Sequence, residues 1–298
     1  MNDGASTPTG GLARVSRELG DELVLVRELP ARRGFSAKVR LRGELHLLKY
    51  VELRANADTA TVERHAGLSR EATILADLAP DTPIVAYGDT TVAWLLRPWI
   101  DGSSAWTRTA YIRDDHSTAD RSHFLATVAD LAASVDALHR KGYRHGDLQP
   151  GHFLIGEDEA VTIVDYDVAV RIDAGSAPYS GGLVHYVAPE IAAGMIAGNT
   201  AIPLTAASEV YALGAVVFHL YTGRVPHWYG ADPREDAFTS TGLPEKCRAI
   251  VDGRRRTLLD CDAPDFPELD VFLSACMSPH AADRPTLAAV EAIRPHRP

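Results

Sequence analysis

Two aspartates stand where carboxylates could do chemistry. Asp147 comes just before the apolar run "HFLI", and Asp165 closes the apolar run "VTIVD" eighteen residues later. Val161, Ile163 and Asp165 would share one face of a strand by the two-residue period, which is not where solvation would place an acid. One carboxylate could accept a hydroxyl proton while the other holds a divalent cation against phosphate oxygens. Aspartate also favours turns, so the hypothesis depends on the pair rather than on either residue alone.

A lysine and a glutamate form a second candidate pair. In "LHLLKYVEL" Lys49 alternates with Leu47 and Val51, so a strand there turns the lysine to the apolar side. A cation on that side needs a phosphate or a carboxylate as partner, and Glu71 in "LSREATILADL" is the natural candidate. The alternative is a lysine whose ammonium reaches water and a glutamate exposed on its helix.

The first hundred residues predict strands around one helix. Strand-like runs are "ELVLVREL", "AKVRL" and "LHLLKYVEL", and the last two are joined by "RGE" as a hairpin. Residues 57–78 have a helical pattern, and strand material returns by 92–100. The order is therefore β-β-β-α-β-β. Residues 1–15 are rich in Gly, Ser, Thr and Pro and are expected to be disordered.

After "WIDGSS" the patterns become mostly helical. In "FLATVADLAASVDALHRKGY" one helical face collects the large apolar side chains, namely Phe124, Val128, Leu131, Val135 and Leu138. The run 208–223 is apolar on nearly every side, which is typical of a buried helix, and Gly223 is placed to end it. Residues 268–294 hold two further helical patterns.

These patterns predict an α+β, two-lobe chain. We expect a small antiparallel β-rich lobe with one main helix over residues 16–98 and a larger helical lobe over 99–298. A cleft between two lobes is a favoured place for a small ligand.

Composition excludes several classes of function. The net charge of −10 argues against a nucleic-acid binder, and no apolar run is long enough to span a membrane. The start of the sequence has neither a signal-peptide nor a myristoylation pattern. The three cysteines have no metal-ligand spacing, so we expect buried thiols in a reducing cytoplasm; they are Cys247, Cys261 and Cys276.

Over about residues 20–294 the chain resembles the protein-kinase superfamily, in particular the bacterial eukaryotic-type Ser/Thr kinases. The motifs follow in order: "LHLLKYV" with Lys49, the helix with Glu71, "RHGDLQPGHFL", "DYD", "HYVAPE", "SEVYALGAVVFHLYTGRVPH" and "CMSPHAADRP". The last of these holds Arg284, which in the family pairs with the glutamate of A-P-E, here Glu190.

The resemblance implies a two-lobe protein kinase-like fold and a role for each matching residue. Asp147 would orient or deprotonate the acceptor hydroxyl. Asp165 would hold Mg²⁺ or Mn²⁺, and Lys49, paired with Glu71, would contact the α- and β-phosphates of ATP. His145, Tyr166 and Leu75 would form the side-chain stack that links the lobes.

The resemblance also implies an adenine site. Leu96 would guard the back of the pocket, and the Arg97 carbonyl and the Trp99 amide would meet the adenine edge. Of the glycine-rich loop only Gly34 and the closing Val39 remain. Side chains near that loop could replace lost backbone contacts to phosphate, namely Arg32, Arg33, Ser36 and Lys38.

Several positions depart from the family pattern. His152 stands where an asparagine ligates the second metal, and imidazole suits softer ions than Mg²⁺. Asp167 replaces the glycine of D-F-G and adds a hard carboxylate ligand. Gly146 replaces the arginine that grips a phosphorylated activation segment. Gln149 replaces the catalytic-loop lysine, and Leu183 replaces the threonine that faces it.

Three functions stay open at this point. The first is a cytoplasmic ATP-dependent kinase that acts on Ser or Thr hydroxyls of a protein or peptide. The second is a pseudokinase that binds a nucleotide or a partner without turnover, which His152, Asp167 and the weak glycine loop favour. The third is a small-molecule phosphotransferase, since "HGDL" followed by "DYD" also resembles that branch of the superfamily. The oligomeric state is left open.

Overall fold

The computed structural model describes residues 8–31, 34–114, 117–172, 181–199, 201–235 and 240–291. The chain divides into two compact units, one of residues 1–101 with 165–169 and one of residues 102–164 with 170–298. The first is built on an antiparallel sheet and the second is mainly helical, as the two-lobe α+β prediction requires. The division falls after Asp101 rather than after residue 98, and the short segment 165–169 returns to the first unit.

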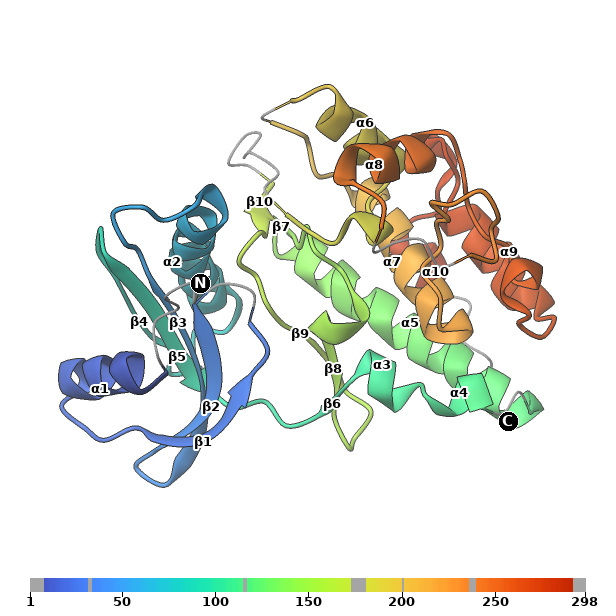
Figure 1. Ribbon diagram of the computed structural model, residues 1–298. Helices are drawn as coiled ribbons and strands as arrows, with labels where there is room; N and C mark the ends of the chain where they lie inside the picture. The colour runs from blue at the N-terminus through green and yellow to red at the C-terminus, as the bar shows by residue number, and fades with distance from the viewer. Residues whose placement is uncertain are drawn as a thin grey trace. The chain divides into compact units, whose positions relative to one another are not determined.

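The first unit is a five-stranded antiparallel sheet with a helix on each face (Figure 1). The strand order is β1-β2-β3-β5-β4, and the bounds are β1 Val24–Leu29, β2 Phe35–Leu41, β3 Glu44–Glu52, β4 Val85–Gly88 and β5 Val92–Pro98. The predicted β2–β3 hairpin is confirmed. Its two-residue loop has positive φ at Arg42 (51°) and Gly43 (89°), the conformation that suits the twist of a tight hairpin.

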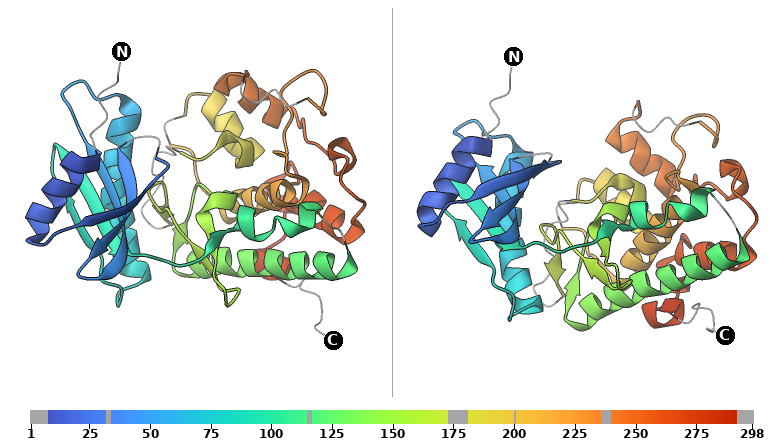
Figure 2. Two further views of the ribbon diagram at one scale, coloured as in Figure 1. Left: turned by 60° about the horizontal axis from the view of Figure 1, so that its bottom comes forward. Right: turned by 90° about the horizontal axis from the view of Figure 1, so that it is seen from below.

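Helix α1 (Pro8–Leu19) corrects the prediction of a disordered start. Leu12 and Val15 are buried against Leu48 and Tyr50 of β3, so α1 covers one face of the sheet (Figures 1 and 2). Leu12, Val15 and Leu19 have helical spacing, but the Gly, Thr and Pro residues around them hid this pattern. Residues 1–7 lie outside the described part of the chain.

Helix α2 (Thr59–Leu78) covers the opposite face of the sheet from α1. It begins at Asp58, whose side chain accepts a hydrogen bond from the backbone N–H of Thr61. Its buried Leu68 packs against Val51 of β3 and Ala93 of β5. Since successive strand residues alternate between faces, Lys49 lies on the α2 side of the sheet with Val51.

The second unit is built from helices, with short strands near its start. The helices are α3 Ala105–Arg108, α4 Tyr111–Asp114, α5 Thr118–Arg140, α6 Pro189–Ile196, α7 Ala206–Thr222, α8 Leu243–Val251, α9 Pro267–Cys276 and α10 Leu287–Glu291. The strands are β6 Ser103–Ser104, β7 Tyr143–Arg144, β8 Phe153–Ile155, β9 Val161–Ile163 and β10 Val170–Arg171. Strands β6, β8 and β9 form one small sheet, and β7 pairs with β10.

The two long helices predicted for this unit are confirmed. The five apolar residues predicted for one face of α5 are all buried, because that face packs into the core. Helix α7 is buried along most of its length. A capping box at Thr205 starts it, and Gly223 ends it with a left-handed φ of 72°. No helix in the described ranges is long and apolar enough to cross a membrane.

Candidate active site

Lys49 of β3 and Glu71 of α2 form the buried ion pair that the sequence predicts. The lysine Nζ donates to both carboxylate oxygens of Glu71, at 2.8 and 2.7 Å, and to Oδ1 of Asp165 at 2.7 Å. Burial alone would lower the pKa of Lys49, but the carboxylates of Glu71 and Asp165 outweigh it and raise that pKa. Lys49 is therefore a fixed cation on the α2 face of the sheet, held between two carboxylates.

The backbone at Asp165 differs from the predicted strand. Strand β9 ends at Ile163, and Asp165 has a left-handed φ of 69° instead of continuing the alternation. A non-glycine residue seldom adopts this conformation, and such residues gather at functional sites. The turn lets Asp165 join the first unit, where its carboxylate reaches Lys49.

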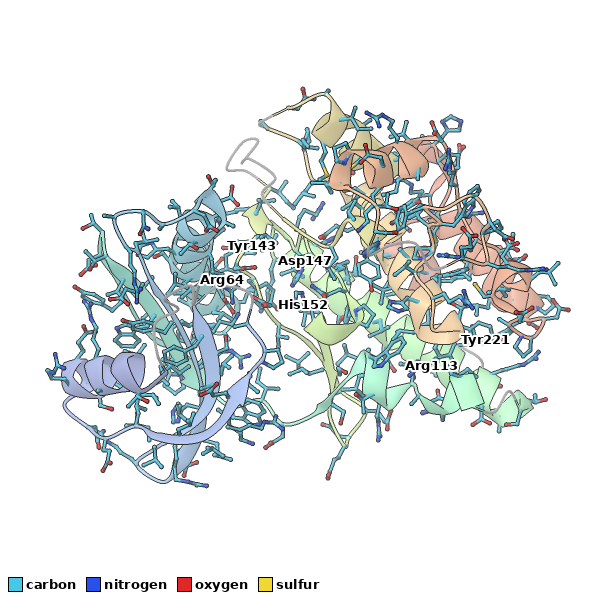
Figure 3. All side chains as sticks on the ribbon, in the orientation of Figure 1. Arg64, Arg113, Tyr143, Asp147, His152 and Tyr221 are labelled. Atoms are coloured by element: carbon cyan, nitrogen blue, oxygen red, sulfur yellow. The ribbon has the colours of Figure 1, made fainter. Side chains whose placement is uncertain are left out.

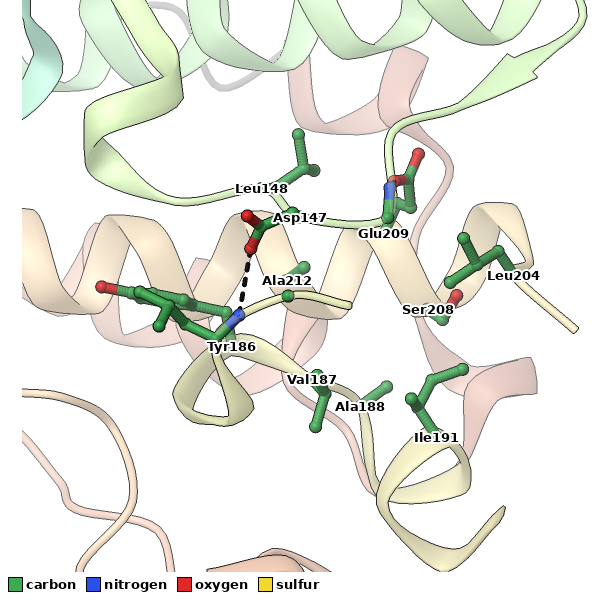
Figure 4. A pocket seen from close by; sticks show the side chains of 13 residues that line it. Asp147, Leu148, Tyr186, Val187, Ala188, Ile191, Leu204, Ser208, Glu209 and Ala212 are labelled. Atoms are coloured by element: carbon green, nitrogen blue, oxygen red, sulfur yellow. Dashed lines mark hydrogen bonds between the residues drawn. The ribbon is translucent and has the colours of Figure 1, made fainter. Parts of the chain in front are cut away.

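Asp147 lies in the second unit, in the loop between β7 and β8 (Figure 3). The side-chain amide of Gln149 donates to its Oδ2 at 2.8 Å, and the backbone N–H of Leu183 donates to its Oδ1 at 3.0 Å. Figure 4 shows the carboxylate directed at this backbone, with the second bond dashed. Both oxygens of Asp147 thus have a donor, so the carboxylate is held in one orientation. Gln149, predicted on the acceptor side, orients Asp147 directly.

His145 holds the loop of Asp147 through two hydrogen bonds. Its Nε2 donates to the carbonyl of Val164 at 3.1 Å, and its Nδ1 accepts from the backbone N–H of Asp147 at 3.2 Å. Burial, and to a smaller degree the neighbouring His152, lower the pKa of His145. The neutral ring is the form that can donate at one nitrogen and accept at the other.

Glu209 of α7 holds the same loop from the other end and was not singled out from the sequence. Its Oε1 accepts from the backbone N–H of Gly146 at 2.7 Å, and its Oε2 lies 2.6 Å from Nε2 of His139 on α5. Burial alone would raise the pKa of Glu209, but the hydrogen bond to His139 and the nearby charges lower it overall. The only sequence signal was an acid inside an otherwise apolar helix.

A small pocket lies beside Asp147 in the second unit (Figure 4). Its walls are the loop at Gly146 and Asp147, the backbone around Leu183 and Tyr186, and Ile191 of α6.

The predicted pair between Arg284 and Glu190 lies elsewhere in this unit and is confirmed, with N–O distances of 2.7 and 2.8 Å.

A family model described as a protein kinase domain matches residues 35–295. The chain belongs to the protein kinase family. It is 27% identical over 168 residues to the probable serine/threonine-protein kinase PknB of Lactococcus lactis, covering 54% of this chain and 25% of that protein. It is 25% identical over 236 residues to mitogen-activated protein kinase kinase kinase 17 of Arabidopsis thaliana, covering 76% and 58%. The chain therefore spans only part of the length of these relatives.

In this member of the kinase family, Asp167 is bound to helix α2. Arg64 contacts the carboxylate of Asp167 and lies 3.5 Å from Oδ1 of Asp165, while Arg70 donates to the backbone carbonyl of Asp167. Gly67 allows the helix to approach Asp167 this closely, because a Cβ at that position would lie 3.0 Å from Cβ of Asp167. Arg64, Gly67 and Arg70 recur every three residues and so lie close together on the helix. That spacing was the signal in the sequence, and the prediction did not use it.

These contacts bear on the predicted metal ligands. The carboxylate oxygens of Asp165 and Asp167 are the kind of ligand that Mg²⁺ prefers. The guanidinium of Arg64, however, already neutralises the charge of Asp167. His152 belongs to the other unit, and its Nδ1 donates to the carbonyl of Asp147 at 2.8 Å. In the parts of the chain that the structure describes, no three His, Cys, Asp or Glu side chains are grouped to hold a metal ion. Asp165 is itself paired with Lys49, so metal binding by Asp165, His152 and Asp167 stays a prediction.

Two predicted nucleotide contacts lie on the wrong face of the sheet. Val39 of β2 and Leu96 of β5 are buried in the cluster that packs against α1. Leu96 pairs with Leu48 in the register, while Lys49 pairs with Leu95. The alternation of strand side chains therefore turns Leu96 away from Lys49 and places Arg97 on its face.

The predicted adenine-facing amide is also engaged elsewhere. The N–H of Trp99 donates to the carbonyl of Leu45 at 2.9 Å and so extends the ladder between β3 and β5. Arg97 pairs with Leu47 in the same ladder, so its backbone faces β3 as well. Neither predicted backbone contact can read a base without leaving the sheet.

The remaining residues of the glycine loop lie near Lys49's face. Gly34 has a left-handed φ of 68°, and a Cβ there would lie 2.1 Å from the carbonyl oxygen of Tyr50. Ser36 pairs directly with Lys49, and Lys38 pairs with Leu47, which puts both on the α2 face. Arg32 and Arg33 lie outside the described residues. The stack of His145, Tyr166 and Leu75 joins residues of both units and stays a prediction.

Proposed function

We propose that the chain transfers the γ-phosphoryl group of a nucleoside triphosphate, with ATP the donor implied by its family, to a Ser or Thr hydroxyl of a protein or peptide. The observation that carries the proposal is the pair of Lys49 with Glu71 and Asp165, at 2.7–2.8 Å. Phosphoryl transfer in this family needs that lysine–glutamate pair in place, because it positions the lysine on the phosphates.

Each residue then has a definite task. Lys49 would bind the nonbridging oxygens of the α- and β-phosphates. Asp147, oriented by Gln149 and Leu183, would accept a hydrogen bond from the acceptor hydroxyl and take up its proton. A Mg²⁺ or Mn²⁺ ion held by Asp165 would neutralise charge on the phosphates.

The acceptor class is supported by the relatives. Two of them, from Lactococcus lactis and Bacillus subtilis, are named as serine/threonine-protein kinases. The pocket beside Asp147 does not add to this support, because its volume of about 20 Å³ holds only one or two water molecules.

The proposal is tested by phosphoryl transfer from labelled ATP to peptide and protein acceptors, with Mg²⁺ and with Mn²⁺. We expect Asp147→Asn to reduce transfer by at least about a hundredfold while nucleotide binding persists. Asp158→Asn is the matched control, because that exposed aspartate only closes a turn with the N–H of Ala160. Transfer that survives Asp147→Asn would refute the proposal, as would incorporation into small-molecule acceptors only.

A pseudokinase is the second candidate, and the contacts of Arg64 favour it. A guanidinium beside Asp165 and Asp167 supplies the positive charge that a metal ion would otherwise bring. In that case wild-type chain would bind nucleotide in EDTA as well as in Mg²⁺ and would transfer no phosphate with either ion.

A further inference from the structure

Arg97 is a buried cation on the face of the sheet that carries Lys49. Its residue is 7% exposed, and its partner in β3 is Leu47, two residues from Lys49. Two strand residues span about 7 Å, so the two cations are separated along the strand by roughly the length of a sugar. If phosphates meet Lys49, the base of the same nucleotide would lie near Arg97.

The strand end beside Arg97 offers one backbone acceptor. The backbones of Arg97 and Trp99 face β3, so that of Pro98 faces the opposite side. Strand β4 begins at Val85, which pairs with Leu96, and therefore stops before it reaches Pro98. The Pro98 carbonyl is instead met by Nη1 of Arg97 at 3.1 Å.

The hydrogen-bond donors of Arg97 match the O6 and N7 edge of guanine and oppose the corresponding edge of adenine. A guanidinium has five donors and no acceptor, and it remains charged although burial lowers the pKa of Arg97. Adenine presents an amino donor at C6 beside N7, and a guanidinium, which has donors only, cannot pair with it. Guanine presents acceptors at O6 and N7, the pair that arginine binds bidentately in the major groove of DNA.

We propose that Arg97 reads the base of the donor nucleotide and makes the chain prefer a 6-oxopurine nucleotide, GTP, over ATP. The inference rests on the proposed function and changes only the donor that the family resemblance implies. Arg97 acts through direct contact with O6 and N7, and the Pro98 carbonyl holds the guanidinium at the required end of β5.

The first test uses the wild-type full chain and three nucleotides, GTP, ITP and ATP, in calorimetric titrations with Mg²⁺. Inosine shares O6 and N7 with guanine but lacks the 2-amino group. We expect GTP and ITP to bind alike and each on the order of tenfold more tightly than ATP. Equal or tighter binding of ATP would overturn the inference and leave the proposed phosphotransfer intact. Failure of all three nucleotides to bind would overturn both.

The second test uses Arg97→Met, which keeps a long side chain and removes the donors. We expect the GTP-to-ATP affinity ratio to fall to about one, that is, the whole of the roughly tenfold preference to be lost. The matched control is Arg42→Met. This residue is an exposed cation in the hairpin between β2 and β3, paired with Asp21, and its loss should leave the ratio unchanged. An unchanged ratio in folded Arg97→Met would overturn the inference. Should that variant fail to fold, the three-nucleotide series on wild type still decides.

Discussion

Replacing Glu209 with glutamine tests how the loop of Asp147 is held. Glu209 is 2% exposed, and one carboxylate oxygen accepts from the N–H of Gly146 at 2.7 Å while the other lies 2.6 Å from Nε2 of His139. Glutamine has the same length but only one acceptor oxygen. If that oxygen keeps Gly146, an amino group faces His139, and one charge-assisted bond is lost while the other becomes neutral.

The size of the effect follows from these two bonds. A hydrogen bond to a charged group contributes about 1.5–3 kcal/mol and a neutral one about 1 kcal/mol. Part of that loss is offset because a neutral amide costs less to bury than a carboxylate. We expect Glu209→Gln to lower the free energy of unfolding of the second unit by about 2 kcal/mol, or its melting temperature by roughly 4–8 °C.

The effect should depend on pH with a definite sign. The folded-state pKa of Glu209 is lowered from its ordinary value of 4.5, so its contribution is fully present above that value. It is lost as pH falls through the lowered folded-state pKa. The difference between wild type and Glu209→Gln should therefore be constant above about pH 5 and shrink in acid.

Urea unfolding followed by tryptophan fluorescence, from about pH 4 to about pH 8, measures this difference. Glu245→Gln is the matched control, since that side chain is 58% exposed on α8, and its effect should stay within about 0.5 kcal/mol. Phosphoryl transfer should also fall, because Gly146 directly precedes Asp147. Equal stability of wild type and Glu209→Gln at neutral pH would refute the reasoning, and so would a difference that grows in acid.

Three further changes test other parts of the structure. Gly34→Ala should lower the free energy of unfolding by about 2 kcal/mol or more, because the new Cβ would meet a carbonyl oxygen of β3 at 2.1 Å. Gly43→Ala, where φ is also positive but the space is open, should lower it less. Equal losses in urea unfolding would contradict this reasoning. Arg284→Met removes both hydrogen bonds to the carboxylate of Glu190 and should lower the free energy of unfolding of the second unit by about 1–2 kcal/mol. Its melting temperature should fall by a few degrees. Burial raises the pKa of Cys276 to about 12, so native-state alkylation should reach half-buried Cys261 first; the reverse order would be inconsistent with the burial.

The sequence predicted those parts of the fold in which one apolar face meets one core. Helices α5 and α7 and the β2–β3 hairpin fall into this class, because periodicity and turn glycines report them directly. The ion pair of Lys49 with Glu71 was also predictable, since a cation within an apolar strand needs a partner. For Glu209 and Arg64 the sequence signals only that a partner is needed, because the partners themselves lie far away in the chain.

The roles of Val39 and Leu96 were taken from the family resemblance, and the pattern of apolar residues could not correct them. Helix α1 buries the second face of the sheet, so β3 is buried at five successive residues instead of alternating. With both faces apolar, period two no longer tells which face meets a ligand, and a shift of one residue moves a side chain to the other face. With α1 overlooked, the alternation of apolar residues therefore gave no sign that both side chains face away from Lys49.

Polar residues resolve the ambiguity that the apolar ones leave. Among the described strands of the five-stranded sheet, the buried polar residues are Ser36, Lys49 and Arg97, one on each of three adjacent strands. Ser36 pairs directly with Lys49, and Arg97 pairs with a neighbour two residues away, so all three share one face. Burying a polar group without a partner is costly, so its strand position marks the side on which partners are found. By that criterion Arg97 belongs with Lys49 on the face for which we propose nucleotide binding.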